Sequence, residues 1–358
     1  MRWKVVIGNL GSILKLFGIA FFVPVIPAVF FNEAPHALGF IPINAVLFLY
    51  LGAFTVTLGY PMEHFGKAED FYHNEAIVIV SSAWLLFAGV SSLPFLLTGA
   101  LTSPIDAFFE AMSGMTTTGA TVLPYPLEQH PKSLMLWRGF LQWIGGMGVI
   151  VLSVAVLSKL SQGGLSLLEA EAPGPTITRL KPKIMETAKI LWYIYGLLTL
   201  SEVIILMGAG LGPYDAVYHS FTTMATGGFS PHTDSIAYFS PIVHWIIIFF
   251  MVLAGINFSL HYQFFKGNIK KVFKNSELQA YLLIIFSFSA VVALIIIGTG
   301  METMDAVRNA VFQVVALMTT TGFATMNYDQ WPELARVLLL LLMFIGGSAG
   351  STGGGMKV

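Results

Sequence analysis

Seven apolar runs, each long enough to cross a lipid bilayer, divide this sequence and restrict what it can fold into. They cover residues 11–31, 38–60, 75–97, 134–158, 187–211, 241–265 and 278–300. A helix needs about 20 apolar residues to span a membrane. Charged residues make up 10% of the chain, whereas a soluble domain carries roughly 25%. We therefore expect an all-α integral membrane protein.

Composition also excludes several classes of function. The net charge of -1 gives no sign of a nucleic-acid partner, and the absence of Cys excludes disulfides, thiolate metal sites and Cys nucleophiles. The basic start is followed by run 11–31 without a small-residue cleavage site, which indicates a retained anchor. The chain contains no HExxH, and GSTGGGMK at 350–357 lacks the Gly-Lys-Ser/Thr of a phosphate loop. We do not expect an enzyme.

Three segments that are too short to span lie between the long runs. Each ends at a Thr/Gly string: 104–116 at MTTTGA, 213–225 at MATGGF and 303–319 at MTTTGF. Residues 104–121 align with 213–230 without a gap, whereas 303–324 needs four extra residues after Asp305. Such self-similarity indicates one structural unit copied along the chain.

The repeat predicts how the chain is organised. We expect an N-terminal helix pair and three pore units, each a span, a half-helix, a string and a second span. Their residues are 1–62 for the pair and 75–160, 187–266 and 278–358 for the units, the last of them incomplete at its final span.

The strings themselves suggest a cation filter. Irregular backbone at membrane depth is tolerated only where protein buries it or water reaches it. Gly can adopt φ values that aim successive carbonyls the same way, and carbonyls around an axis can replace the hydration shell of a cation. The half-helix also directs its negative dipole end at the string. The competing interpretation is close helix packing through small residues, which three strings in register make less attractive.

Lysine and arginine set the expected orientation. They concentrate in residues 159–189 and 266–277 and are sparse around the strings. By the positive-inside rule these two loops are cytoplasmic and the strings face outside.

Several longer motifs resemble one known family. They are SGMTTTGATVLPYP (113–126), RGFLQWIGGMGVIVLSVAVL (138–157), EAEAPGP (169–175), ETAKILWYIYGLLTL (186–200), DAVYHSFTTMATGGFSPH (215–232) and GGSAGSTGGGMKV (346–358). Together they resemble the Trk/Ktr/HKT superfamily of potassium-uptake proteins. The N-terminal helix pair favours the bacterial Trk-type membrane (pore) subunit.

The resemblance implies potassium translocation across the cell inner membrane, with potassium as the transported ion and no covalently bound cofactor. It implies four repeats around a pseudo-fourfold pore, a homodimer in the lipid bilayer and a cytosolic nucleotide-binding regulatory ring. The filter residues it implies are Thr117, Thr118, Gly119, Thr226, Gly227, Gly228, Thr320, Thr321 and Gly322. An ion-coupled symporter, driven by protons or sodium through the same pore, remains the alternative.

A Gly-rich stretch at 346–355 interrupts the last apolar run. Such a break cannot hold a helix, and the resemblance places it below the filter as a gate. The gate residues are Gly346, Gly347, Gly350, Gly353, Gly354 and Gly355.

Polar residues near the strings are expected to support the filter. Glu202 lies in the middle of span 187–211, where a bare charge would be costly. We expect it to brace the second filter, and the alternative is that it lines the ion path. Glu110 and His219 align with each other on the half-helices, and Gln313 holds the third position. Carboxylates that open the half-helices are expected to cap their free N–H groups; they are Asp106, Asp215 and Asp305.

Three repeats are present, whereas the resemblance implies four. We therefore expect the reading frame to continue past Val358 into a fourth unit. By the repeat spacing, its filter Gly would lie roughly 100 residues beyond Gly322.

Overall fold

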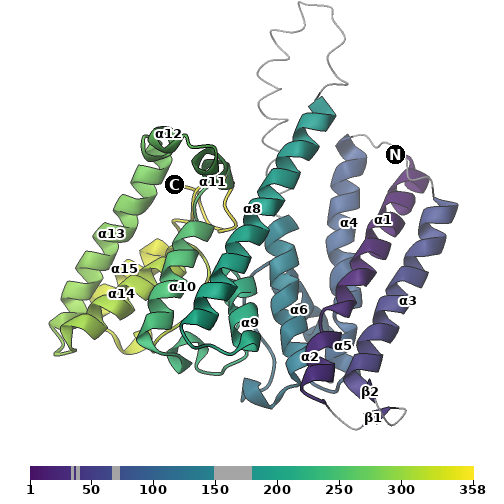
Figure 1. The fold of residues 1–358 in the computed structure, drawn as a ribbon, viewed down its shortest axis with the longest axis horizontal. Helices are drawn as coiled ribbons and strands as arrows, with labels where there is room; N and C mark the ends of the chain where they lie inside the picture. The colour runs from purple at the N-terminus through teal and green to yellow at the C-terminus, as the bar shows by residue number, and fades with distance from the viewer. Residues whose placement is uncertain (34–35, 38–40, 67–72, 149–179) are drawn as a thin grey trace, which may run out of the picture. The chain divides into compact units, whose positions relative to one another are not determined.

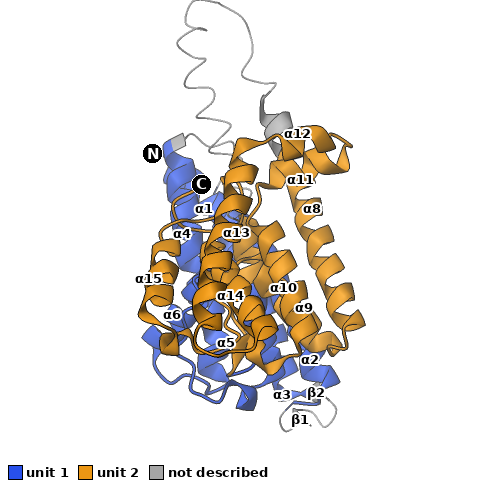
Figure 2. Ribbon diagram, turned by 90° about the vertical axis from the view of Figure 1, so that its left-hand side faces the viewer, with its two compact units in different colours: residues 1–141, 231–233 blue, residues 142–230, 234–358 orange. Residues whose placement is uncertain are grey.

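The computed structural model describes residues 1–358 except 34–35, 38–40, 67–72 and 149–179. Regular structure in this part of the chain is helical, apart from a short antiparallel ribbon and one isolated bridge. The ribbon pairs β1 (His36–Ala37) with β2 (Ile41–Pro42). Residues 1–141 with 231–233 form one compact unit, and residues 142–230 with 234–358 form the second (Figure 2).

The first unit is a bundle of apolar helices (Figure 1). Its helices are α1 (Trp3–Gly18), η1 (Ile19–Phe22), α2 (Val25–Phe30), α3 (Ile43–Phe65), α4 (His73–Ser91), α5 (Leu93–Leu97), α6 (Pro104–Met115) and η2 (Leu127–Gln129). Helices α1 and α3 approach closely because glycines face each other. A Cβ on Gly11 would lie 2.7 Å from the carbonyl oxygen of Gly59. Small residues permit such contact between membrane helices.

The second unit contains the later repeats. Its helices are α8 (Leu180–Gly208), α9 (Pro213–Met224), η4 (Ser235–Tyr238), α10 (Pro241–Ala254), α11 (Phe258–Phe265), α12 (Ile269–Phe273), α13 (Ser276–Ile297), α14 (Thr303–Met318), η5 (Tyr328–Gln330) and α15 (Glu333–Leu342). Its core is made by the apolar faces of α10, α13 and α14, including Ile247, Val292 and Phe312. A further helical stretch covers 132–148, and the boundary between the units falls inside it.

Five of the predicted spans are long apolar helices. They cover Trp3–Phe30, Ile43–Phe65, Asn74–Leu97, Glu186–Gly208 and Ser276–Ile297. The first begins eight residues before predicted residue 11, because the amphipathic start of the chain is helical too. Only the first part of span 134–158 lies within the described residues.

Span 241–265 differs from the prediction. Instead of one straight helix, α10 and α11 are bent by 98° at a short break, as in a broken span or a re-entrant loop. Asn257 caps α11 by accepting a hydrogen bond from Ser259 N at 2.9 Å. Apolar content alone could not show this break, because the residues on both sides of it are apolar.

The three half-helices begin at the predicted residues and each ends one residue earlier than predicted. Helices α6 and α9 contain 12 residues each and α14 contains 16, which accounts for the four extra residues of the third repeat. At 1.5 Å per residue even the longest is about 24 Å, shorter than the roughly 30 Å hydrocarbon core.

The capping prediction was wrong in detail. Asp106, Asp215 and Asp305 lie in the first turns. The residue that caps α6, however, is Ser103, whose hydroxyl accepts the Asp106 N–H, and no side chain caps α14.

Candidate functional site

The three Thr/Gly strings have the same unusual backbone. The third residue of each string, a Thr, is left-handed, with φ of 54° at Thr117, 52° at Thr226 and 59° at Thr320. The Gly two residues later is left-handed as well, with φ of 78° at Gly119, 73° at Gly228 and 80° at Gly322. A β-branched residue rarely adopts positive φ, and such strain persists only where the surroundings impose it. The strings are therefore one structural device, built three times.

Hydrogen bonds from each string return to its own half-helix. In the second string, the N–H of Thr226 donates to Thr223 O at 2.9 Å and that of Gly227 to Thr222 O at 2.9 Å. The same pattern is repeated in the first string, from Thr117 to Gly114 O and from Thr118 to Ser113 O, and in the third, from Thr320 to Leu317 O and from Thr321 to Ala316 O. These string N–H groups therefore donate to the half-helix, and the string carbonyl groups take no part in those hydrogen bonds.

Within the described part of the chain, most of the expected carbonyls accept no hydrogen bond. The free ones belong to Thr117, Thr118, Gly119, Thr226, Gly228, Thr320, Thr321 and Gly322. The exception is Gly227, whose carbonyl oxygen accepts a hydrogen bond from Gln142 Nε2 at 2.7 Å.

The second and third strings meet within the second unit. A Cβ added to Gly228 would lie 1.8 Å from the carbonyl oxygen of Thr321. No side chain fits at that distance, and the positive φ of Gly228 disfavours one independently. The first string belongs to the other unit.

Hydroxyl pairs stabilise two of the strings. Thr116 and Thr118 hydroxyls lie 2.8 Å apart in the first string, and Thr319 and Thr321 hydroxyls lie 2.7 Å apart in the third. The second string has Ala225 and Gly227 at these positions and cannot make the pair.

In the second string, the side chain of Gln142 substitutes for the missing hydroxyl pair. Its amide donates to Gly227 O and its Oε1 accepts the N–H of Phe229 at 3.2 Å, so that one side chain holds the string on both sides of Gly228. Gln142 is fully buried. Sequence reasoning missed it, although the absence of hydroxyls at positions 225 and 227 was a visible signal that another group must replace them.

Glu110 braces the segment that follows the first string. Its Oε1 lies 2.6 Å from Arg138 Nε and accepts the Thr121 hydroxyl at 3.0 Å, while Oε2 accepts the Val122 N–H at 2.9 Å. Both partners of the ion pair are almost completely buried. The carboxylate is therefore paired and hydrogen-bonded, as a buried charge must be.

His219 and Gln313 hold the equivalent place in the other two repeats. His219 Nε2 lies 3.2 Å from the hydroxyl of Ser230, and Gln313 Nε2 donates weakly to Phe323 O at 3.5 Å. All three polar groups precede their string Gly by nine residues and reach the one to three residues after it. The alignment made from sequence thus identified a shared position.

Glu202 has a different environment. It is fully buried on α8, and neither carboxylate oxygen makes a hydrogen bond of ordinary geometry in the described structure. The polar group that faces it is the hydroxyl of Thr223, in the last turn of half-helix α9. Glu202 thus adjoins the second half-helix, where sequence reasoning placed it.

The Gly-rich segment 346–355 is docked against the break between α10 and α11. The N–H of Ser348 donates to Gly255 O at 2.9 Å, the hydroxyl of Thr352 donates to Ala254 O at 3.1 Å, and the N–H of Phe258 donates to Gly350 O at 3.1 Å. A Cβ on Gly347 would lie 2.9 Å from the Gly255 carbonyl oxygen. The break in α10–α11 and the glycines of the segment therefore fit each other.

The same segment is also tied to the third string and to α13. The N–H of Gly354 donates to the Thr320 hydroxyl at 2.7 Å, and the N–H of Ala349 donates to the carboxylate of Glu277. Two glycines of the segment meet each other, because a Cβ on Gly346 would lie 1.9 Å from Gly354 O. A string residue and the Gly-rich segment are thus in direct contact.

Glu128 joins the loops that follow the first two strings. Its two carboxylate oxygens accept the N–H and the hydroxyl of Thr233, each at 2.7 Å. Burial raises the pKa of Glu128, but these hydrogen bonds outweigh burial, so that the pKa lies below its usual value.

Comparison with known proteins decides the family. The family model described as TrkH, cation transport protein, matches residues 45–358. The chain belongs to the TrkH family of cation transport proteins. It is 40% identical over 366 residues to the Trk system potassium uptake protein TrkH of Vibrio parahaemolyticus, covering 100% of this chain and 74% of that protein. The TrkH of Escherichia coli K12 is 43% identical over 291 residues, which are 80% of this chain and 60% of the relative.

The fold agrees with this membership. The crystal structure of the potassium transporter TrkH from Vibrio parahaemolyticus matches with a TM-score of 0.85 at 36% identity, over 100% of this chain and 73% of that one. The predictions of an all-α multi-pass membrane protein, of a Trk-type family and of a transporter rather than an enzyme are confirmed. The pseudo-fourfold arrangement, the domain boundaries and the fourth repeat stay predictions.

Proposed function

We propose that this TrkH-family chain forms part of a potassium pathway in which backbone carbonyls of the three strings contact the ion. The observation that carries the proposal is the left-handed Thr followed by a left-handed Gly, repeated in all three strings. Such a backbone turns successive carbonyls to one side, while the string N–H groups remain bonded to the half-helix. Carbonyl oxygens in this arrangement can replace the hydration shell of a monovalent cation.

Potassium is the proposed ion for two reasons. The matched relatives from Vibrio parahaemolyticus and Escherichia coli are named potassium uptake proteins. In the superfamily that the sequence resembles, Gly at the first filter position accompanies potassium preference, and this chain has Gly119 there. Cytoplasmic loops at 159–189 and 266–277, a second copy of the chain and a cytosolic nucleotide-binding ring belong to the same proposal.

The roles of the supporting residues follow from their contacts. Glu110, His219 and Gln142 hold the strings or the residues just after them and are not proposed to touch the ion. Glu202 adjoins the last turn of α9 and is proposed to support the second filter segment. The Gly-rich segment 346–355 is proposed as the gate, because it is bonded to both a string residue and a broken helix.

Substitution of Gly119 by Ser tests the filter. A side chain at φ of 78° strains the backbone and moves the neighbouring carbonyls, so we expect sodium flux to rise relative to potassium flux. Gly99 has a φ of 74° in the same unit, with open space around its Cβ position, and Gly99→Ser is the matched control.

The measurement is flux of both ions into liposomes that contain the complete protein. An unchanged sodium-to-potassium ratio in Gly119→Ser, or an equal change in Gly99→Ser, would contradict the filter assignment. Repeating the measurement with and without a pH gradient distinguishes a channel-like pathway from proton-coupled symport.

A further inference from the structure

The segment 258–274, which we call the elbow, contains α11 and α12, and its α11 leaves the axis of α10 at 98°. Helix α10 is apolar apart from His244, and α13 returns directly after the elbow as a full span. A helix at about a right angle to a membrane-crossing helix runs close to the plane of the membrane surface. An α11 that runs in this plane can reach the lipid headgroups.

The side chains of the elbow suit that depth. Phe264, Phe265, Ile269 and Phe273 are exposed by 48%, 55%, 47% and 61%. Aromatic and aliphatic residues in such numbers on a charged segment are typical of helices that lie in the interface. Other side chains of the elbow are covered, since Phe258 and His261 of α11 and Val272 of α12 are buried.

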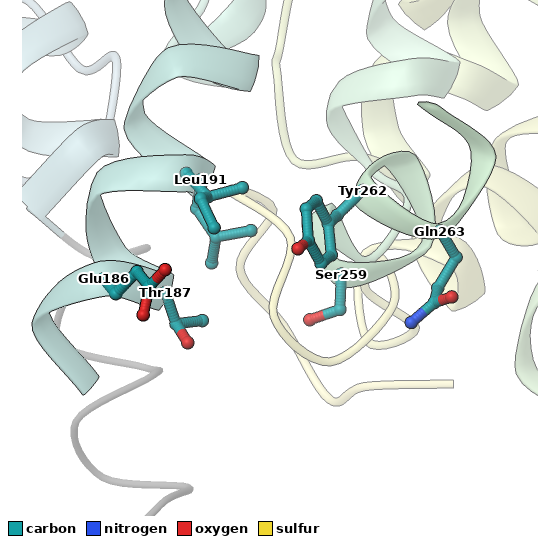
Figure 3. Close-up of a pocket in the computed structure, with 7 residues that line it drawn as sticks. Glu186, Thr187, Leu191, Ser259, Tyr262 and Gln263 are labelled. Carbon is teal, nitrogen blue, oxygen red and sulfur yellow. The ribbon is translucent and has the colours of Figure 1, made fainter. Parts of the chain in front are cut away.

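Charge makes the surface specific. The elbow holds four lysines and neither Asp nor Glu. All four are exposed, and none pairs with a carboxylate in the part of the chain that the structure describes. The ammonium of Lys266 lies 4.4 Å from the centre of the Tyr262 ring. Of the acids on neighbouring helices, Glu186 lines a cavity of about 270 Å³ between α8 and α11 (Figure 3), and Glu277 of α13 accepts the N–H of Ala349.

We propose that the elbow is a binding surface for anionic lipid headgroups, with its apolar side chains inserted among the acyl chains. Lysines near an anionic membrane surface each contribute about 1 kcal/mol, a factor of about five in affinity. The lysines follow the apolar residues directly in sequence: Phe265–Lys266, Ile269–Lys270 and Phe273–Lys274. Three of the four lysines thus adjoin an exposed apolar residue in the sequence.

The test compares phosphatidylglycerol with phosphatidylcholine on the complete, delipidated protein, by lipid retention in native mass spectrometry. The triple variant Lys270→Gln, Lys271→Gln, Lys274→Gln should lose preference for phosphatidylglycerol by up to about fivefold for each lysine. The triple variant to Arg should keep it. Lys15→Gln is the matched control, because that ammonium is already paired with Glu63.

A second measurement locates the elbow independently of charge. Because the chain has no Cys, Phe273→Cys introduces a single spin-labelling site whose depth can be measured in vesicles of either lipid. The proposal expects the label at headgroup depth. A label in bulk water, one immobilised by protein contact with a second copy or another partner, or an unchanged lipid preference in the Gln variant would each overturn it.

Discussion

Gln142 gives the sharpest perturbation of the proposed filter. It satisfies two backbone groups around Gly228 at once, and the residues it serves are themselves buried. Gln142→Leu keeps the approximate volume of the side chain and removes both hydrogen bonds. The carbonyl of Gly227 and the N–H of Phe229 are then left without partners.

The magnitude follows from those two groups. An unsatisfied buried backbone group costs about 1–3 kcal/mol, so Gln142→Leu should lower the free energy of unfolding by about 2–6 kcal/mol. Gln142→Glu should keep the bond from Phe229 N but place a carboxyl oxygen against Gly227 O. It should therefore distort the second string even where the protein still folds.

A double-mutant cycle with Gly227 makes the reasoning specific. A Cβ on Gly227 would lie 2.3 Å from Gln142 Cδ, so Gly227→Ala should be severe alone and milder in a Gln142→Ala background. We expect a coupling free energy of about 0.5–3 kcal/mol.

The assays are detergent unfolding of the purified protein and the sodium-to-potassium flux ratio in liposomes. Additive effects of the two substitutions, or an unaltered flux ratio in a folded Gln142→Leu protein, would refute the role of Gln142 as the support of the second string.

Three further predictions follow from other contacts. Removing the Thr320 hydroxyl frees the N–H of Gly354. Because that hydrogen bond is worth about 1 kcal/mol, Thr320→Val should raise basal potassium flux by about fivefold. Thr320→Ser should not raise it, and equal flux in both variants would contradict the proposed gate. Arg138→Met strands the buried carboxylate of Glu110 and should cost about 3–5 kcal/mol in unfolding experiments, part of which Glu110→Gln should recover in the double variant; no recovery would argue against the ion pair as the cause. The pKa of Glu128 is lowered in the folded protein, so its stabilisation is present above the ordinary Glu pKa and is lost as pH falls through the folded pKa. Glu128→Gln should remove this part of the acid dependence of thermal unfolding. An identical acid profile in both proteins would refute the prediction.

Much of the fold was predictable because the signals are local. Apolar length located most spans, and the three strings in register located the half-helices to within a few residues. The extra turn of α14 followed from the four residues needed after Asp305. These features depend on hydropathy and on sequence repetition, both of which can be read from the sequence itself.

The missed features depend on partners distant in sequence. Gln142 acts on Gly227 and Phe229, 85 and 87 residues away, and no motif on its own helix indicates this. The break between α10 and α11 is hydrogen-bonded to segment 346–355, which is distant in sequence. Apolar content alone therefore predicted a straight span. Ser103 replaced Asp106 as the cap of α6 because the position of the cap depends on where Pro104 begins the helix.

The docking of segment 346–355 determines how often and how fast the segment can leave its site. To leave its site, the segment must release hydrogen bonds to Gly255, Ala254, Phe258, Thr320 and Glu277 together, because they hold one short stretch of chain. At about 1 kcal/mol for each bond, the displaced arrangement would be populated about once in several thousand molecules at equilibrium. Excursions of this collective kind occur in microseconds to milliseconds, far more slowly than an ion moves between neighbouring carbonyls. Flux through such a pathway would come in rare bursts, and a regulator would act by altering how often a burst begins.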